Sequence, residues 1–189
     1  MRILDVGCGA SKFEGSIGID RLNMPEVDVV WELDNLPWPF EDKSFERIIF
    51  KHAIMHLSDI VKVMDEVYRL LNDDGTVEIL APHYSSDNSF TDPTHKFSLG
   101  IRSMNYFCDN LPNWKYNYSD NLFKLNTCYI SFLQCNVDFN KQGYKSRTNF
   151  FKLIGIEFFA NKFPRLYEKY LCNYIPANEV YFNLVKVKS

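Results

Sequence analysis

The residue types best suited to acid–base chemistry are concentrated in residues 82–96, which read PHYSSDNSFTDPTHK. Histidine is the side chain best suited to acid–base chemistry near neutral pH, so His83 or His95 could take or return a proton. We expect His83 or His95 to act as a general base or to contact the substrate, with Asp92 orienting one of the imidazoles. Two other uses stay open. His83, Asp92 and His95 could ligate a metal ion, or Asp92-Pro93-Thr94-His95 could be a turn that caps a helix. Of the three uses we favour the first, and we predict no resident metal.

A second group of suggestive residues lies at the start of the chain, where residues 1–20 read MRILDVGCGASKFEGSIGID. Two short apolar runs typical of buried parallel strands end in Gly7-Cys8-Gly9 and in Asp20. Ligands of open α/β sheets bind outside the carboxyl ends of the strands, so the glycines and Asp20 should face one crevice. A carboxylate there suits the two hydroxyls of a ribose, which donate hydrogen bonds. The stretch therefore predicts a nucleoside site.

This stretch lacks the third glycine of a dinucleotide fingerprint, because Lys12 stands at that position. LDVGCG followed by IGID instead resembles the first motifs of class I S-adenosylmethionine (SAM) dependent methyltransferases. The resemblance implies that Asp5 lies by the methionine ammonium of SAM, that the Gly7-Cys8-Gly9 backbone approaches the ligand, and that Asp20, with Arg21 beside it, holds the ribose. The family usually fits a full helix between the second glycine and this acid. Here only 11 residues separate Gly9 from Asp20, so we expect a turn or a more open crevice.

Residues 36–57, LPWPFEDKSFERIIFKHAIMHL, follow the same family's pattern of Leu-Pro, aromatic, acidic turn, Ser-Phe, apolar strand and His-containing exit. The resemblance places Glu32 and Leu33 at the adenine, with Asp34 as their neighbour. It gives the strand exit at residues 51–56, which includes His52, a backbone role against the methionine part of SAM. His52 and His56 have the spacing of a metal pair on a helix, but we discount this because the segment is a strand exit and no acid follows at catalytic-zinc spacing.

Composition and length exclude several classes of protein. The chain has 189 residues, 46% of them hydrophobic, which indicates one globular domain. A net charge of −3 gives no general attraction to nucleic acid. The five cysteines are odd in number and form no C-x-x-C pair, which favours reduced thiols in a cytoplasmic protein. No charged-then-apolar leader and no long apolar run is present, so we predict neither secretion nor a membrane span.

Periodicity predicts the elements that position these residues. Apolar runs predict strands at residues 2–6, 17–19, 27–31, 76–81, 123–137 and 180–187, and a turn followed by a strand within residues 41–50. An amphipathic helix is expected from Ser58, as N-cap, to Leu71, and further helical segments at 98–109, 146–160 and 163–171. We therefore expect an α/β, doubly wound, mostly parallel seven-stranded sheet with an antiparallel last strand. Residues 1–189 would form a single, N-terminally short domain in which 97–175 are a substrate-side insertion or lid.

The loop at 82–96 also resembles a group of small bacterial methyltransferases with a His after the fifth strand and an Asp-Pro-Thr-His tetrad. This resemblance implies methyl transfer from SAM to a small molecule, such as a hydroxyl of a sugar or glycoconjugate precursor. Two other functions stay open: a SAM-binding subunit that needs a partner to complete its site, and an RNA or protein methyltransferase. We expect a small-molecule acceptor and no nucleic acid partner, and the sequence is compatible with a homodimer.

Overall fold

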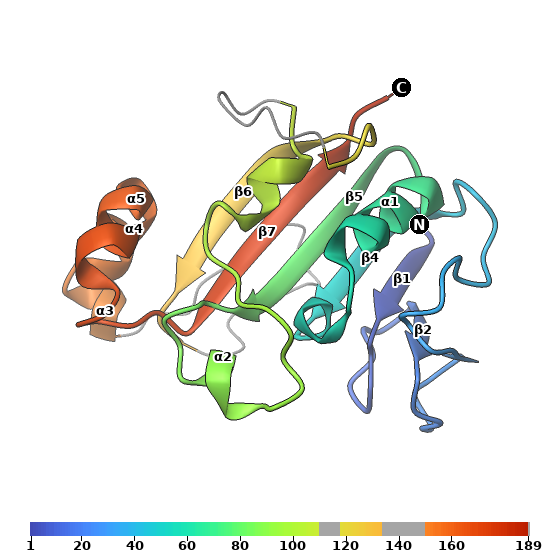
Figure 1. Ribbon diagram of the computed structural model, residues 1–189, viewed down its shortest axis with the longest axis horizontal. Helices are drawn as coiled ribbons and strands as arrows, with labels where there is room; N and C mark the ends of the chain where they lie inside the picture. The colour runs from blue at the N-terminus through green and yellow to red at the C-terminus, as the bar shows by residue number, and fades with distance from the viewer. Residues whose placement is uncertain (110–117, 134–149, 189) are drawn as a thin grey trace.

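The apolar runs of the sequence become the strands of one sheet in the computed structural model, which describes residues 1–109, 118–133 and 150–188. The strand order is β3-β2-β1-β4-β5-β7-β6 (Figure 1). The strands are β1 (Ile3–Val6), β2 (Ile17–Asp20), β3 (Val29–Val30), β4 (Phe45–Lys51), β5 (Leu71–Pro82), β6 (Phe123–Ser131) and β7 (Glu179–Lys186).

Pairing between the strands confirms the predicted fold class. The strands β1, β2, β3, β4 and β5 pair in parallel, whereas β7 pairs antiparallel with both β5 and β6. The strands β1, β4 and β7 are largely buried, as expected for the middle of such a sheet, whereas β3 and much of β6 at its edges are more exposed. Because β1, β2, β4 and β5 are parallel, the residues that follow them gather at one edge of the sheet.

The connection from β1 to β2 is a loop of turns, because residues 7–16 contain no helix. The backbone returns directly, and the N–H of Gly7 donates to the carbonyl of Ile19 at 2.8 Å. The short spacing between Gly9 and Asp20 predicted either a turn or a more open crevice, and the structure has turns in place of the helix. The segment between β1 and β2 is tied to the sheet by backbone and carboxylate hydrogen bonds instead of helix packing.

The predicted amphipathic helix is α1 (Ile60–Leu70), which lies on the near face of the sheet in Figure 1. It buries Val63, Met64 and Val67. Its N-cap is Asp59, whose carboxylate accepts from the N–H groups of Val61 and Lys62, both at 3.1 Å. The prediction of Ser58 as the N-cap is therefore wrong, because the Ser58 hydroxyl donates to Asp34 at 2.6 Å instead.

The remaining elements are short. They are η1 (Ile54–His56), α2 (Asn88–Thr91), η2 (Ser103–Phe107), α3 (Phe150–Leu153), α4 (Ile156–Lys162), α5 (Pro164–Leu166) and the π-helical turn η3 (Tyr167–Leu171). The predicted helix at 98–109 is reduced to the 3₁₀ turn η2. Gly155, with φ 80°, separates α3 from α4 and so divides the predicted helix at 146–160, of which 146–149 lie outside the described residues. The predicted strand at 123–137 ends at Ser131, and 134–137 also lie outside them.

The range 97–175 supplies one strand of the sheet, β6, and the helices α3, α4 and α5, which lie beyond β6 in Figure 1. The lid within this range stays a prediction. Cys8, Cys108, Cys128 and Cys172 are free thiols, and Cys135 lies outside the described residues. None of the helices in the described part of the chain has the length and apolarity that a membrane crossing requires.

The corrected N-cap can be tested by substitution. Asp59→Ala should lower the free energy of unfolding by about 1 kcal/mol, because two N–H groups at the start of α1 lose their acceptor. Ser58→Ala is the matched control and should cost less, because Ser58 bonds only to groups at the surface. Urea denaturation of both variants measures the difference, and a larger loss for Ser58→Ala would restore Ser58 as the cap.

Candidate functional site

A cavity of about 770 Å³ opens at the carboxyl ends of β1, β2 and β4. Its volume lies in the range of small-molecule and cofactor sites. Nine residues predicted from the sequence line it: Gly7, Asp20, Arg21, Glu32, Leu33, Asp34, His52, Asp92 and His95. The structure thus brings most of the predicted nucleoside residues and the Asp92–His95 loop to one cavity, whereas the predicted Asp5, Cys8 and Gly9 do not line it.

The carboxylate of Asp20 joins the turn after β1 to the end of β2 through two hydrogen bonds. Its Oδ2 accepts from the N–H of Gly9 at 2.9 Å, and its Oδ1 accepts from the N–H of Leu22 at 2.9 Å. Asp20 is only 8% exposed, and it lines the cavity. A carboxylate has about four lone-pair positions, so the two that remain can accept from the hydroxyls of a ribose.

Gly7 is required by the close approach of two strand ends. It has φ 69°, and a Cβ at this position would lie 2.5 Å from the Cβ of Ala53. Any side chain at position 7 would therefore push the exit of β4 away from the turn after β1. Beside it, burial together with Asp5 and Asp20 raises the pKa of the Cys8 thiol to about 11. Cys8 is therefore a neutral, buried group beside the carboxylates.

Asp5 presents a buried polar atom without a partner. It is 3% exposed, and its Oδ2 accepts from the N–H of Phe13 at 2.7 Å. Its Oδ1 has no hydrogen-bond partner among the described residues. Burial raises the pKa of Asp5, although the Phe13 N–H and the positive charges of Lys51 and Lys12 oppose the shift. A cationic group of a ligand would satisfy this oxygen, which fits the ammonium of SAM.

The residues predicted to meet the adenine, Glu32 and Leu33, also line the cavity, with their neighbour Asp34. Leu33 is buried and gives an apolar surface, while Glu32 is exposed. Asp34 accepts from the Ser58 N–H at 2.7 Å and from the Lys96 ammonium at 2.9 Å. Burial alone would raise the pKa of Asp34, but the hydrogen bonds from Ser58 and Lys96 outweigh it and lower that pKa. Asp34 therefore ties the wall to the loop that carries His95.

His52 lines the cavity at the exit of β4 with its backbone in the left-handed region, at φ 55°. Its N–H donates to the carbonyl of Leu80 at 2.9 Å, and its Nε2 lies 3.0 Å from Oε1 of the buried Glu179. The side chain is thus held against the first residue of β7. The turn of the backbone at His52 lets Ala53 meet Gly7.

The loop after β5 folds back over η1 and creates a cluster of three side chains. One ligand atom each from His56, Asp92 and His95 lies within 4.8 Å of the others, and the two imidazole rings are 4.7 Å apart. Burial lowers the pKa of His56, and the neighbouring His95 lowers it further. The loop is anchored by the N–H of Lys96, which donates to the carbonyl of Met55 at 2.9 Å.

His56 is the site residue that the sequence did not assign. Its spacing from His52 is misleading, because His52 faces Glu179 while His56 faces the loop. To assign His56 to the site, sequence analysis would have had to pair it with the Asp-Pro-Thr-His tetrad. These residues come together only because the loop folds back over η1.

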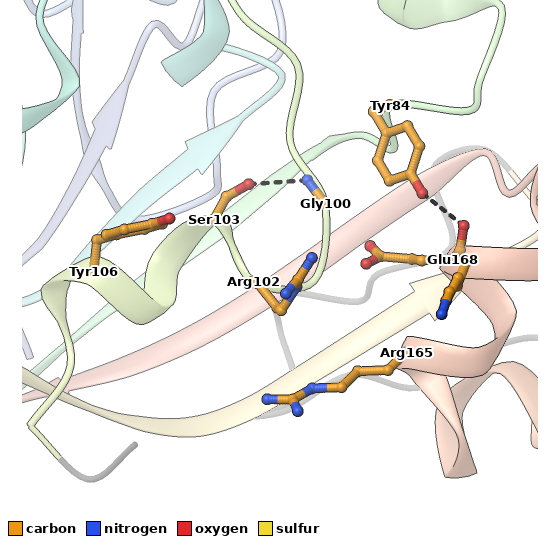
Figure 2. Close-up of a pocket in the computed structure, with 8 residues that line it drawn as sticks. Tyr84, Gly100, Arg102, Ser103, Tyr106, Arg165 and Glu168 are labelled. Atoms are coloured by element: carbon orange, nitrogen blue, oxygen red, sulfur yellow. Dashed lines mark hydrogen bonds between the residues drawn. The ribbon is translucent and has the colours of Figure 1, made fainter. Parts of the chain in front are cut away.

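His83 does not join this cluster. Its side chain is fully buried, with Nδ1 2.8 Å from the Ser85 hydroxyl and Nε2 3.2 Å from Oε1 of Glu168. Glu168 lines a second cavity of about 510 Å³, which Arg102 and Arg165 also line (Figure 2). Asp92 and His95 thus share the first cavity, whereas the imidazole of His83 contacts a residue of the second.

The sheet order, the antiparallel β7 and the cavity at the carboxyl ends of β1 and β2 agree with the fold that the resemblance to class I SAM-dependent methyltransferases implies. Comparison with known proteins agrees. Residues 14–79 match a family model described as a methyltransferase domain. The uncharacterized methyltransferase YcgJ of Bacillus subtilis is 28% identical over 142 residues, or 64% of this chain and 56% of YcgJ. The chain thus spans just over half the length of this curated relative.

Solved structures share the fold at low identity. A SAM-dependent methyltransferase from Archaeoglobus fulgidus gives a TM-score of 0.59 at 18% identity, covering 98% of this chain and 86% of that one. The crystal structure of YcgJ gives 0.54 at 16% identity, covering 100% and 92%. A SAM-dependent methyltransferase from Thermotoga maritima gives 0.58 at 16%, covering 98% and 82%. These solved structures show that the chain shares their fold, and the segment 14–79 matches a methyltransferase domain.

The position of Asp20 predicts its effect on binding. Asp20→Asn should weaken SAM binding by about tenfold or more, because a hydrogen bond to a charged group contributes roughly 1.5–3 kcal/mol. Asp28→Asn is the matched control, because Asp28 also accepts a backbone N–H, from Gly18 at 2.7 Å, but does not line the cavity. Isothermal titration calorimetry measures both affinities, and an unchanged affinity for Asp20→Asn would remove Asp20 from the site.

Proposed function

We propose that this chain transfers the methyl group of SAM to a hydroxyl of a small-molecule acceptor. The observation that carries the proposal is the single cavity lined both by the nucleoside residues Asp20 and Leu33 and by the loop residues Asp92 and His95. Methyl transfer needs a nucleophile held close to the donor, and one cavity with both sets of residues provides that proximity.

In this proposal SAM is held by residues from three strand ends. Asp20 accepts from the ribose hydroxyls, the orphaned Oδ1 of Asp5 faces the methionine ammonium, and Leu33 packs against the adenine. When bound, SAM supplies an electrophilic methyl carbon on its sulfonium. Gly7 lets the exit of β4 lie against the turn after β1, because a Cβ at position 7 would lie 2.5 Å from the Cβ of Ala53.

The acceptor would bind at the loop side of the cavity. A hydroxyl becomes a good nucleophile only when its proton is removed, which the Asp92–His95 loop would promote. The hydrogen bond of His95 Nδ1 to the carbonyl of Ser89, 3.2 Å long, makes Nδ1 the protonated nitrogen. Nε2 of His95 therefore carries the lone pair that can interact with an acceptor hydroxyl or with what activates it.

The charged side chains of the cavity favour a polar acceptor. Asp92 and Lys96 of the loop line it together with Arg21 and Glu32 from the cofactor side, and these groups offer both donors and acceptors of hydrogen bonds. A sugar or a glycoconjugate precursor presents many hydroxyls to such a surface. The choice of a sugar comes from the resemblance of the Asp-Pro-Thr-His loop, and the charged lining is compatible with it.

The open connection between β1 and β2 favours one second candidate function. With turns in place of a helix over residues 7–16, the cavity has less cover from its own chain, as in a SAM-binding subunit that a partner completes. Such a subunit would bind SAM but would form no S-adenosylhomocysteine by itself.

His95→Ala should leave SAM affinity unchanged and lower turnover by about 10² or more, the usual contribution of a group that assists proton transfer. The measurement is S-adenosylhomocysteine formation with a panel of monosaccharides and nucleotide-activated sugars, with SAM affinity measured in parallel. Asp87→Asn, in the same loop but outside the cavity lining, should keep the wild-type rate. Full turnover by His95→Ala would contradict the role of the loop. SAM binding without product from any acceptor would favour the subunit.

A further inference from the structure

Three side chains with metal-binding atoms converge at the loop side of the cavity. His56 comes from the end of η1, and Asp92 and His95 come from the loop after α2. Their ligand atoms lie within 4.8 Å of one another, a separation that a single ion at about 2.0–2.2 Å from each ligand can bridge after small rotations of the side chains. We propose that His56, Asp92 and His95 bind a divalent transition-metal ion.

The hydrogen bonds around the cluster assign which atoms are available to a metal. The Thr94 hydroxyl donates its one proton to Oδ1 of Asp92 at 2.7 Å, so it accepts from His56 Nδ1, 2.8 Å away. His95 Nδ1 donates to the carbonyl of Ser89. Both imidazoles are therefore protonated on Nδ1, and each presents the lone pair of Nε2.

Asp92 completes the set with its second oxygen. Its Oδ1 already accepts from the Thr94 hydroxyl and from the Thr94 N–H, the latter at 2.8 Å, which leaves Oδ2. The three residues lie close enough for their free electron pairs to be turned toward one another, where the pairs would repel without a cation between them. A shared cation satisfies all three.

The partners of these ligands match the outer shell of known metal sites. Metal-binding histidines usually donate their other ring N–H to a carbonyl, a carboxylate or another oxygen, which fixes the orientation of the ring. His95 does so to Ser89 and His56 to Thr94, and Thr94 holds Asp92 as well. Thr94 is therefore a positioning residue for two of the three ligands.

The ligand chemistry selects the kind of ion. Two imidazoles and one carboxylate suit Zn²⁺, Fe²⁺ or a related transition metal, whereas Mg²⁺ prefers oxygen ligands only. Three protein ligands leave coordination positions open. The three residues line the large cavity, so an acceptor with oxygen donors, such as two neighbouring hydroxyls, could occupy these positions.

This use of the ion rests on the proposed function, but binding of the ion does not. A metal-bound hydroxyl has a lower pKa, which would explain how a loop without a buried carboxylate pair activates an acceptor. The metal site that the sequence left open combined Asp92 and His95 with His83. In the structure His56, not His83, lies beside Asp92 and His95.

The test is titration of the metal-free full chain with Co²⁺, followed by its visible absorption. One equivalent should bind. Asp92→Asn and His95→Ala should each weaken Co²⁺ binding at least about tenfold. Asp92 is exposed, so its substitution should leave the fold intact. Thr94→Ala should weaken Co²⁺ binding by about 10–100-fold, the usual effect of losing an outer-shell partner. His52→Gln is the matched control, because His52 lines the same cavity but faces Glu179, and it should keep wild-type Co²⁺ affinity.

Circular dichroism confirms that each variant is folded, and SAM affinity is measured on the same samples. Wild-type protein that binds no Co²⁺ at 1 mM, or equal affinity in wild type, Asp92→Asn and His95→Ala, would overturn the metal site. SAM binding that persists in either case would leave the proposed function intact. Co²⁺ binding by a chain that does not bind SAM would support the metal site and contradict the proposed function instead.

Discussion

The structure around the cavity depends on one buried carboxylate. Asp20 accepts the N–H of Gly9 from the turn after β1 and the N–H of Leu22 from the end of β2. These two bonds hold the glycine turn against the second strand in a connection that has no helix to do so. The same carboxylate keeps lone pairs directed at the cavity, so the group that shapes the site is also the group that can recognise a ribose.

The rest of the site follows from how strand ends meet at this edge. Gly7 and Ala53 touch, which brings the exit of β4 against the turn after β1. The exit continues into η1, and the loop after β5 returns over η1 through the bond from Lys96 to Met55. Lys96 then reaches Asp34 on the adenine side. One continuous chain of contacts therefore links the proposed cofactor side to the proposed acceptor side.

Much of the fold could be predicted from local sequence pattern. The apolar runs that end in glycine or acid became parallel strands, and the last strand inserted antiparallel as the resemblance implied. Helix boundaries were less predictable, because they depend on contacts. Ser58 is as good an N-cap type as Asp59, but its hydroxyl is taken by Asp34, a residue 24 positions away. Gly155 interrupts a helical pattern because it adopts a positive φ.

The candidate site likewise contains residues that local sequence pattern predicts and residues whose positions depend on long-range contacts. Residues fixed by strand ends, such as Gly7 and Asp20, could be placed from the sequence because parallel strands end at one edge. Residues in the long loop could not. His83 and His95 are both in the loop, yet one is buried against Glu168 and the other faces the cavity. Which of them reaches the crevice depends on long-range packing that no short motif encodes.

The most direct test of the central claim is a crystal structure of the chain grown with S-adenosylhomocysteine. The ribose hydroxyls should lie within hydrogen-bond distance of the Asp20 carboxylate, with the adenine against Leu33 and the sulfur facing the side of the cavity that holds His95. Nucleoside density in the cavity bordered by Arg102 and Arg165, or no bound nucleoside at millimolar ligand, would contradict it.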